Sequence, residues 1–386
     1  MNSMSRAIYL DHNASAPLLP IVLRSMTPFL RGFVGNPSSI HADGRRARAA
    51  LDRARATIAE AIHASPHELV FTSGGTESNV LALTGYAAVH PEAVLAVGAA
   101  EHPCVLKTAD ALAKRGSTVR LVRVDHEGRI DPHSVLRQLD APGALVSIQL
   151  SNHELGTIQP IRAITELAHA RGAVVHVDAV AAFGKIPVDV HELGVDLLSL
   201  SAHKLGGPVG IGALFVRRGT SLEPQMHGGS QEHGLRAGTE SVALAVGFAT
   251  AVESCVRIRE RVAARHVRLR RRLLVRLHDH NISFVENSPR SDVVANTINL
   301  AFAGADRESL LIQLDLAGFR VSAGAACASG SLEASPVLLA CGLDDSRTRC
   351  ALRLSFGPTT SAQHVDLFVD ALGPALARAR NAHENF

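Results

Sequence analysis

Residues 173–207 read AVVHVDAVAAFGKIPVDVHELGVDLLSLSAHKLGG, and this stretch decides the fold. Two short apolar runs, 173–177 and 196–200, are each followed at once by polar residues. Neither run alternates strictly between apolar and polar residues, which is typical of strands covered on both faces. The pattern therefore predicts neighbouring strands of a buried, mostly parallel sheet.

Short apolar runs alternate with helical patterns over residues 45–250. Apolar runs recur at 68–72, 94–98, 119–124, 144–148, 173–177, 196–200 and 211–215. Helical patterns lie between them, for example at 45–63 and at 161–171, where Arg171-Gly172 forms a basic last turn with a glycine stop. The alternation of strands and helices predicts an α/β fold.

The alternating sequence pattern ends near Gly247. An arginine-rich helix is expected at 249–280, followed by apolar runs at 295–301 and 352–356. This C-terminal third predicts a smaller α+β subdomain.

Composition excludes several classes of protein. A formal net charge of +3 over 386 residues is too small to indicate direct nucleic-acid binding. The five cysteines are widely spaced without a CxxC pair, which argues against a disulfide framework and against a zinc site, so no metal is expected. No apolar stretch is long enough for a signal peptide or a membrane span. We expect a soluble cytoplasmic protein without membrane contact.

Lysine is scarce, with only Lys107, Lys114, Lys185 and Lys204 in the chain. Lys204 follows an apolar run directly and is surrounded by small residues, including Gly206 and Gly207. A buried lysine loses proton affinity and becomes an amine nucleophile able to form a Schiff base. A lone lysine in this position is more often a surface residue in a turn.

Two further segments carry polar groups next to strands. Asp178 ends the run 173–177, where an aspartate is most often a cap or turn residue. Residues 71–78, FTSGGTES, lead from a strand through small residues into a helix. The N–H groups of such a helix start, with Thr76 beside them, are able to hold a phosphate, although many helices open with Ser, Thr and Gly.

Cys327 lies in VSAGAACASGS, residues 321–331, which has no apolar anchors. This composition predicts a mobile, exposed loop, which a thiol needs if it is to move between a sulfur donor and a sulfur acceptor. The cysteine of a small-residue turn is, however, often incidental. Cys255, Cys341 and Cys350 lie in helical or apolar contexts and are expected to be inert. Cys104, two residues after His102, is a weaker candidate for the reactive thiol.

Taken together, these segments resemble the cysteine desulfurases of the NifS-like and IscS-like group, within the class V aminotransferases of pyridoxal-phosphate fold type I. The shared segments follow the family order almost from end to end. They are YLDHNAS from Tyr9, GNPSS from Gly35, TSGGTES from Thr72, Glu101-His102, HVD ending at Asp178, SAHK ending at Lys204, HGGSQE from His227, LRAGTE from Leu235, GAAC ending at Cys327 and LRLSF from Leu352.

The resemblance implies an architecture and a cofactor. A large domain at 14–250 would be built on a mostly parallel seven-stranded sheet, and a smaller α+β domain would comprise 1–13 and 251–386. Pyridoxal 5′-phosphate would be bound covalently by Lys204, with Asp178 against its pyridine nitrogen and His102 stacked on its ring. The phosphate would be held by Gly75, Thr76, Ser201 and His203.

The resemblance also implies the substrate and the assembly. Arg353 would grip the carboxylate of L-cysteine, with Asn152 as a second substrate contact, and a planar guanidinium suits that task. Cys327 would attack the substrate sulfur, leaving L-alanine and a persulfide that is passed to an acceptor protein. Thr239 would reach a phosphate across the interface of a homodimer.

Two positions depart from the family pattern. His153 stands where the family usually has an asparagine, and Ala181 where it usually has a glutamine. Both positions would face the phenolic oxygen of the cofactor. An imidazole N–H is able to replace a lost amide donor, so His153 is expected to contact the cofactor.

The sequence is also compatible with a selenocysteine lyase or a cysteine sulfinate desulfinase of the same fold. A further alternative is a non-catalytic scaffold protein for sulfur transfer. The cysteine at position 327 favours a desulfurase, and intact Lys204 and Asp178 argue against a scaffold. The sulfur has three possible destinations, which are iron–sulfur assembly, tRNA thiolation and DNA phosphorothioation. General likeness to the desulfurase of DNA phosphorothioation adds the third, without requiring this chain to bind DNA.

Overall fold

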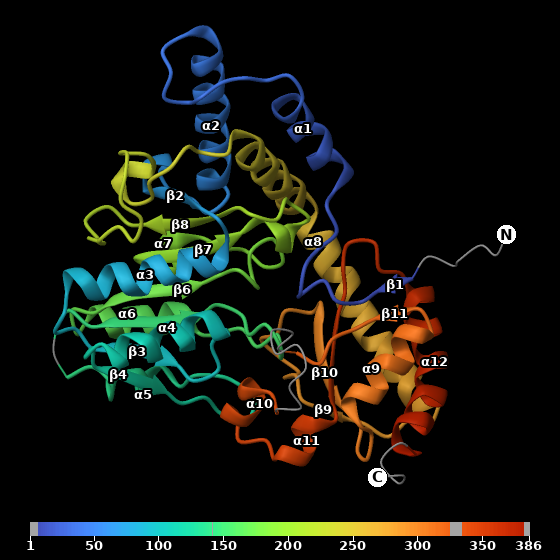
Figure 1. Ribbon diagram of the computed structural model, residues 1–386. Helices are drawn as coiled ribbons and strands as arrows, with labels where there is room; N and C mark the ends of the chain where they lie inside the picture. The colour runs from blue at the N-terminus through green and yellow to red at the C-terminus, as the bar shows by residue number, and fades with distance from the viewer. Residues whose placement is uncertain (1–6, 141, 325–333, 382–386) are drawn as a thin grey trace.

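A computed structural model describes residues 7–140, 142–324 and 334–381. Its centre is a seven-stranded sheet in the order β2-β8-β7-β6-β5-β3-β4 (Figure 1). The strands are β2 (Leu69–Thr72), β3 (Leu95–Gly98), β4 (Val119–Val122), β5 (Leu145–Gln149), β6 (Val174–Asp178), β7 (Leu197–Ser201) and β8 (Gly212–Val216). All seven predicted runs form these strands, and the sheet is parallel except that β8 runs opposite to β2 and β7. The predicted α/β architecture is confirmed.

Helices cover both faces of this sheet, which explains why its strands are apolar throughout. One face packs against α3 (Gly75–Val89) and α4 (Pro103–Lys114). The other packs against α6 (Ile161–His169), where the sequence predicted a helix, and against the first part of the long helix α8 (Val242–Asp279). The remaining predicted helix is α2 (Ala42–Glu60), which packs against α8.

A second core lies beside the first and is built mainly from the C-terminal third. Its antiparallel sheet has the order β12-β10-β9, with β9 (Val285–Glu286), β10 (Thr297–Ala301) and β12 (Ala351–Ser355). Helices α9 (Arg307–Leu316) and α12 (Ala362–Asn381) pack together on this core. The N-terminal strand β1 (Ile8–Tyr9) pairs with β11 (Phe319–Arg320), so both ends of the sequence contribute to the second core.

Helix α8 joins the two cores (Figure 1). Its first part buries Ala251 and Val252 in the first core, and its last part buries Leu269 and Leu273 in the second. The helix begins at Val242 rather than at residue 249, because the preceding apolar residues pack against the first core. The predicted domain boundary at residue 250 thus falls within a continuous helix, and the division into two domains stays a prediction. None of the helices in the described ranges is both long and apolar enough to cross a membrane.

Candidate active site

The polar residues singled out in the sequence gather at the carboxyl ends of neighbouring parallel strands. His102 follows β3, residues 152–154 follow β5, Asp178 ends β6, and Ser201 ends β7 before Lys204. Gln149 pairs with Asp178 across β5 and β6, which fixes these strand ends side by side. The carboxyl edge of a parallel sheet is where open α/β folds bind their ligands.

Asp178 is held rigidly at the end of β6 and is 5% exposed. Its Oδ2 accepts a hydrogen bond from Nδ2 of Asn79 at 2.8 Å, and its Oδ1 accepts from the backbone N–H of Val180 at 2.9 Å. Asn79 lies on α3 and was missed by the sequence reasoning. The available signal was a polar residue on an otherwise apolar helix face, directly after the TSGGTES segment. The carboxylate is thereby oriented before any ligand arrives.

Lys204 lies in a single 3-10 turn, Ala202–Leu205, immediately after β7. The turn ends at Gly206, whose φ of +78° is in the left-handed region that favours glycine. The Lys204 amine donates hydrogen bonds to the carbonyl oxygens of Asn13 and Ala14, the latter at 2.9 Å. A segment near the N-terminus therefore holds the amine that the sequence identified.

The first turn of α3 lies against the ends of β6 and β7. A Cβ atom placed on Gly75 would meet Val180 Cγ2 at 2.7 Å and Ser201 Cβ at 3.6 Å, so only glycine permits this approach. Gly74 precedes the helix and supplies no side-chain cap, which leaves the N–H groups of the first turn open to an anion. The Ser201 hydroxyl is buried and has no hydrogen-bond partner among the described residues.

These groups match the phosphate of pyridoxal phosphate, which accepts hydrogen bonds and favours a helix N-terminus. His203 lies nearby, with Nδ1 3.3 Å from the Ser15 hydroxyl. Burial, aided by the charge of Lys204, lowers the pKa of His203 to about 4, so the ring is neutral near pH 7. With an amine, a carboxylate and an open phosphate cradle in one place, the residues present fit this cofactor.

His102 caps the N-terminus of α4, where its Nδ1 accepts from the backbone N–H of Cys104 at 3.2 Å. Its ring centre is 5.2 Å from that of His153, in an edge-on arrangement. Burial lowers the pKa of His102, while the charge of Asp178 opposes this effect and that of Lys204 adds to it. The two charged groups that perturb His102 are those expected at the two ends of the cofactor ring.

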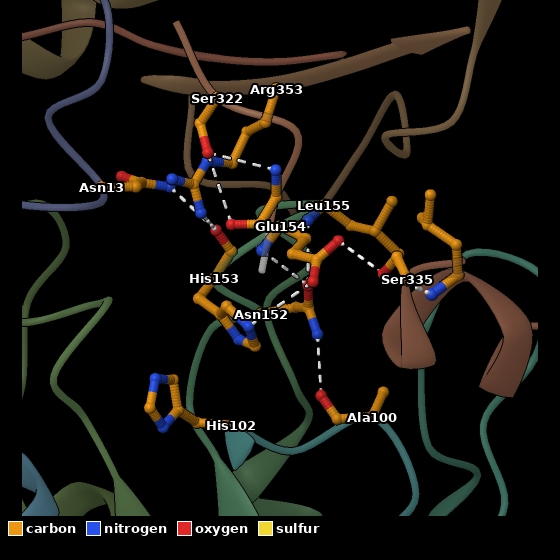
Figure 2. Close-up of polar contacts among 12 residues, drawn as sticks. Asn13, Ala100, His102, Asn152, His153, Glu154, Leu155, Ser322, Ser335 and Arg353 are labelled. Carbon is orange, nitrogen blue, oxygen red and sulfur yellow. Dashed lines mark hydrogen bonds and ion pairs between the residues drawn. The ribbon is translucent and has the colours of Figure 1, made fainter. Parts of the chain in front are cut away.

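Arg353 and the turn at 152–154 connect the two cores (Figure 2). Arg353 is 2% exposed, and its guanidinium contacts Asp11 Oδ1 at 2.7 Å and the His153 carbonyl at 3.1 Å. Its Nε has no partner among the described residues. The Asn152 side chain holds the turn itself, since it donates to the Ala100 carbonyl at 3.0 Å and accepts from two backbone N–H groups, those of Glu154 and Leu155.

The tautomer of His153 limits what its ring can donate. Nδ1 lies 3.3 Å from Oε1 of Gln149, an acceptor, because the Gln149 amide nitrogen donates to the Ala100 carbonyl. Burial lowers the pKa of His153 well below its usual value, so the ring is neutral. With the proton on Nδ1, the buried Nε2 is an acceptor. Donation from His153 to the phenolic oxygen therefore requires Nδ1 to release Gln149, and this contact stays a prediction.

Thr239 is exposed and lies on the loop between the 3-10 turn Glu232–Gly234 and α8. It lines a cavity together with Phe71, Thr72, Arg236 and Glu240. Its expected role, to bind the cofactor phosphate of a second subunit, remains a prediction.

Cys327 lies outside the described residues, but the residues that flank its segment converge on one side chain. Ser335 donates to Oε2 of Glu154 at 2.7 Å, and a Cβ atom on Gly324 would clash with the same oxygen. Among the described cysteines, burial raises the pKa of Cys104 and Cys341 to about 12 and that of Cys255 to about 11. These thiols keep their protons near pH 7 and are poor nucleophiles.

Comparisons with known proteins agree with the geometry. The model of the family described as aminotransferase class-V matches residues 8–368. A cysteine desulfurase IscS of Dictyoglomus turgidum is 41% identical over 98% of this chain and 96% of its own length.

Two solved structures have similar folds. A NifS-like protein superposes with a TM-score of 0.90 at 33% identity, covering 96% of this chain and 99% of its own. DndA from Streptomyces lividans gives 0.76 at 34% identity, covering 90% of this chain and 99% of its own. The chain therefore belongs to the class-V aminotransferase family, among the relatives of the IscS-like and NifS-like cysteine desulfurases.

Proposed function

We propose that this chain is a pyridoxal-phosphate-dependent cysteine desulfurase that takes the sulfur of L-cysteine onto Cys327 and releases L-alanine. The observation that carries the proposal is the placement of the Lys204 amine and the Asp178 carboxylate at adjacent strand ends beside the open first turn of α3. When bound, pyridoxal phosphate withdraws electrons from the substrate and so allows its bonds at the α- and β-carbons to react.

Asp178 and Lys204 have separate tasks. The carboxylate of Asp178, fixed by Asn79, would lie against the pyridine nitrogen of the cofactor and would keep it protonated. Lys204 would hold the cofactor covalently and would move a proton at the substrate α-carbon. The Lys204 amine donates to the carbonyl oxygens of Asn13 and Ala14, and these contacts hold it at the end of β7.

The phosphate would be held by the N–H groups of the first turn of α3 together with Thr76, Ser201 and His203. Neutral His203 would supply one N–H donor, and the Ser201 hydroxyl, which has no partner within the described ranges, would gain an acceptor. Thr239 of one subunit would complete the phosphate site of the other subunit in a homodimer.

Arg353 would bind the substrate carboxylate and thereby orient the substrate sulfur. It is already buried and fixed by Asp11, and its Nε lacks a partner among the residues described, so a carboxylate would satisfy a group that is otherwise unpaired. Asn152 would act on the substrate chiefly by holding the turn that carries His153.

Cys327 would act as the nucleophile toward the substrate sulfur. A new S–S bond forms between the Cys327 thiolate and that sulfur while the Cβ–S bond of the substrate breaks. The electron pair of the broken bond goes to the substrate carbon, which takes up a proton and becomes the methyl group of alanine. The step needs no external oxidant, and the raised pKa values of Cys104, Cys255 and Cys341 leave Cys327 as the best candidate.

The sulfur then passes to an acceptor protein, for which the proposal leaves three destinations: iron–sulfur assembly, tRNA thiolation and DNA phosphorothioation. The relatives named IscS and the neighbour named DndA support sulfur transfer as the shared purpose. Selenocysteine lyase and cysteine sulfinate desulfinase activities gain no support from these names. Incubation with ³⁵S-cysteine and a lysate of the source organism would identify the protein that takes up the label.

Borohydride reduction of the holoenzyme tests the central assignment. With four lysines in the chain, peptide mapping has a small set of outcomes, and reduction should fix the cofactor to the peptide containing Lys204. A Lys204→Ala variant should lose the covalent label and the yellow colour, whereas Lys107→Ala, at an exposed position on α4, should retain both. Attachment at Lys185 instead would overturn the proposal.

A further inference from the structure

Two of the four lysines in the chain converge on one residue, Asn13. The amine of Lys185 donates to Asn13 Oδ1 at 2.7 Å, and the amine of Lys204 donates to the Asn13 carbonyl oxygen. Lys204 is explained by the proposed chemistry, but Lys185 has no part in it. In a lysine-poor chain, a second buried amine beside the first requires a reason of its own.

Asn13 is locked in one orientation. It is 4% exposed, and its Oδ1 accepts from Lys185 and, at 3.1 Å, from Asn296. Its Nδ2 donates to Thr297 Oγ1 at 2.8 Å and to the His153 carbonyl at 3.2 Å. Removing Lys185 would take away one of the two donors to Asn13 Oδ1 and so loosen the segment whose backbone carbonyls hold Lys204.

The surroundings of Lys185 are unusually cationic for an interior. The groups that act on it are Lys204, Arg353 and the Cys255 thiol, and its own charge acts in turn on His12 and His266. No carboxylate is among these groups. Burial first, then the charges of Lys204 and Arg353, lower the pKa of Lys185 to about 7. Burial also lowers the pKa of His12 and His266 to about 4, so both rings are neutral near pH 7.

We propose that Lys185 is a positioning residue for Lys204, which it serves in two ways. Through Asn13 it fixes the carbonyl groups that hold the Lys204 amine, and its positive charge favours loss of the proton from Lys204. The second effect follows because a like charge nearby disfavours the protonated form of an amine. The inference rests on the proposed role of Lys204, whose amine must be neutral to act as a nucleophile or a base.

The charge state of Lys185 is measurable in the holoenzyme by NMR with ¹³Cε-labelled lysine. Four lysines give few signals, which substitution of each by Arg assigns. We expect the Lys185 signal to titrate near neutral pH, at about 7. The signals of Lys107 and Lys114, both on α4, provide the internal reference. A Lys185 that is neutral throughout the neutral pH range would overturn the proposal, because the positive charge that acts on Lys204 would then be missing.

The effect on Lys204 is read from the pH titration of the cofactor absorption band. Relative to the parent enzyme, Lys185→Met should raise the midpoint by about 1 pH unit, because it removes a like charge. Lys185→Arg keeps a permanent cation and should lower the midpoint, while Lys107→Met should leave it unchanged. Coincident midpoints for the Met, Arg and parent enzymes would also overturn the proposal.

Two outcomes have to be distinguished from failure of the proposal itself: misfolding of a variant and failure of the proposed function. If Lys185→Met does not fold, the Arg variant and the NMR titration of the parent enzyme carry the test by themselves, since neither needs an apolar side chain at this position. If borohydride attaches the cofactor elsewhere than at Lys204, the proposed function fails. The NMR titration of Lys185 would still report its charge independently of that result.

Discussion

At the scale of single residues, the site depends on groups whose charge is set by their surroundings. Asp178 is held in one orientation because Asn79 and the Val180 N–H both donate to it. His153 and His203 stay neutral because burial lowers their pKa values. The described thiols stay protonated for the same reason. This leaves a clear division of labour, in which Lys204 and Asp178 serve the cofactor and Cys327 serves the sulfur.

Replacing Cys327 with Ser tests this division. Alanine formation from cysteine should fall by roughly 10³-fold or more, the scale expected when a nucleophile is lost. Cofactor binding, the yellow colour and the spectral shift on adding cysteine should survive, since none of them needs the thiolate. These are measured by an alanine assay and by absorption spectra.

The matched control is Cys350→Ser, which changes a buried thiol with a raised pKa and should retain most of the activity. If Cys327→Ser makes alanine at close to the original rate, Cys327 is not the nucleophile. The Cys104 thiol, 3.0 Å from His102 Nδ1, would then be the next candidate.

At the scale of elements, the loop that carries Thr239 is anchored by one buried ion pair. Glu232 accepts two hydrogen bonds from Arg55, at 2.6 and 2.7 Å, and a third from the Phe71 N–H at 2.7 Å. The side chains of Arg55 and Glu232 are 8% and 2% exposed. Arg55 also lies over the Phe71 ring, 4.7 Å from its centre. This pair therefore holds helix α2 and strand β2 against the 3-10 turn that precedes the Thr239 loop.

Breaking this pair should destabilise the protein strongly. Arg55→Met leaves the Glu232 carboxylate buried without its cation, at a cost of about 3–5 kcal/mol in the free energy of unfolding. Arg162→Ala breaks the exposed pair with Glu166 and should cost at most about 0.5 kcal/mol. Urea unfolding at saturating cofactor measures both, and equal costs would show that the Arg55–Glu232 pair contributes little.

At the scale of the whole molecule, the site lies where the two cores meet. The segment around Asn13 pairs with the smaller sheet through the Ser355 hydroxyl, yet its carbonyl holds Lys204 of the larger core. Arg353, on the smaller sheet, contacts the carbonyl of His153 in the larger core. Any relative movement of the cores would therefore alter the lysine and the substrate arginine together.

Subunit mixing tests the proposed homodimer and its shared sites. A heterodimer of Lys204→Ala and Thr239→Val subunits should keep one intact site if Thr239 serves its neighbour, because both lesions then fall in the same site. Its activity at limiting cofactor should be about half that of the parent dimer, because a two-fold symmetric dimer has two equivalent sites and one of them stays intact.

The alternative outcome is equally clear. If Thr239 serves its own subunit, both sites of the heterodimer carry a lesion, and the activity should not exceed that expected from the Thr239→Val sites. The Thr239→Val homodimer and the Lys204→Ala homodimer provide the reference values. A protein that is monomeric during sedimentation would contradict the proposal outright.

The sequence by itself determined the elements and the chemistry-bearing residues at their ends. All seven strands of the large sheet were predicted, since a strand covered on both faces is apolar throughout and local composition suffices to find it. Asp178 and Lys204 were identified because each directly follows or ends such a run. The start of α8 was placed too late, since its first turns are helical through packing against the first core rather than through a local signal.

Only the tertiary structure decided how these residues are held. Asn79 reaches Asp178 across 99 positions of sequence, and Asn13 reaches Lys204 across 191. The Nδ1 contact that makes His153 Nε2 an acceptor, and the burial that gives Lys185 a near-neutral pKa, depend on neighbours from several elements. Local patterns carry no record of such neighbours, because hydrogen bonding, desolvation and charge coupling depend on distance in space rather than on distance along the chain.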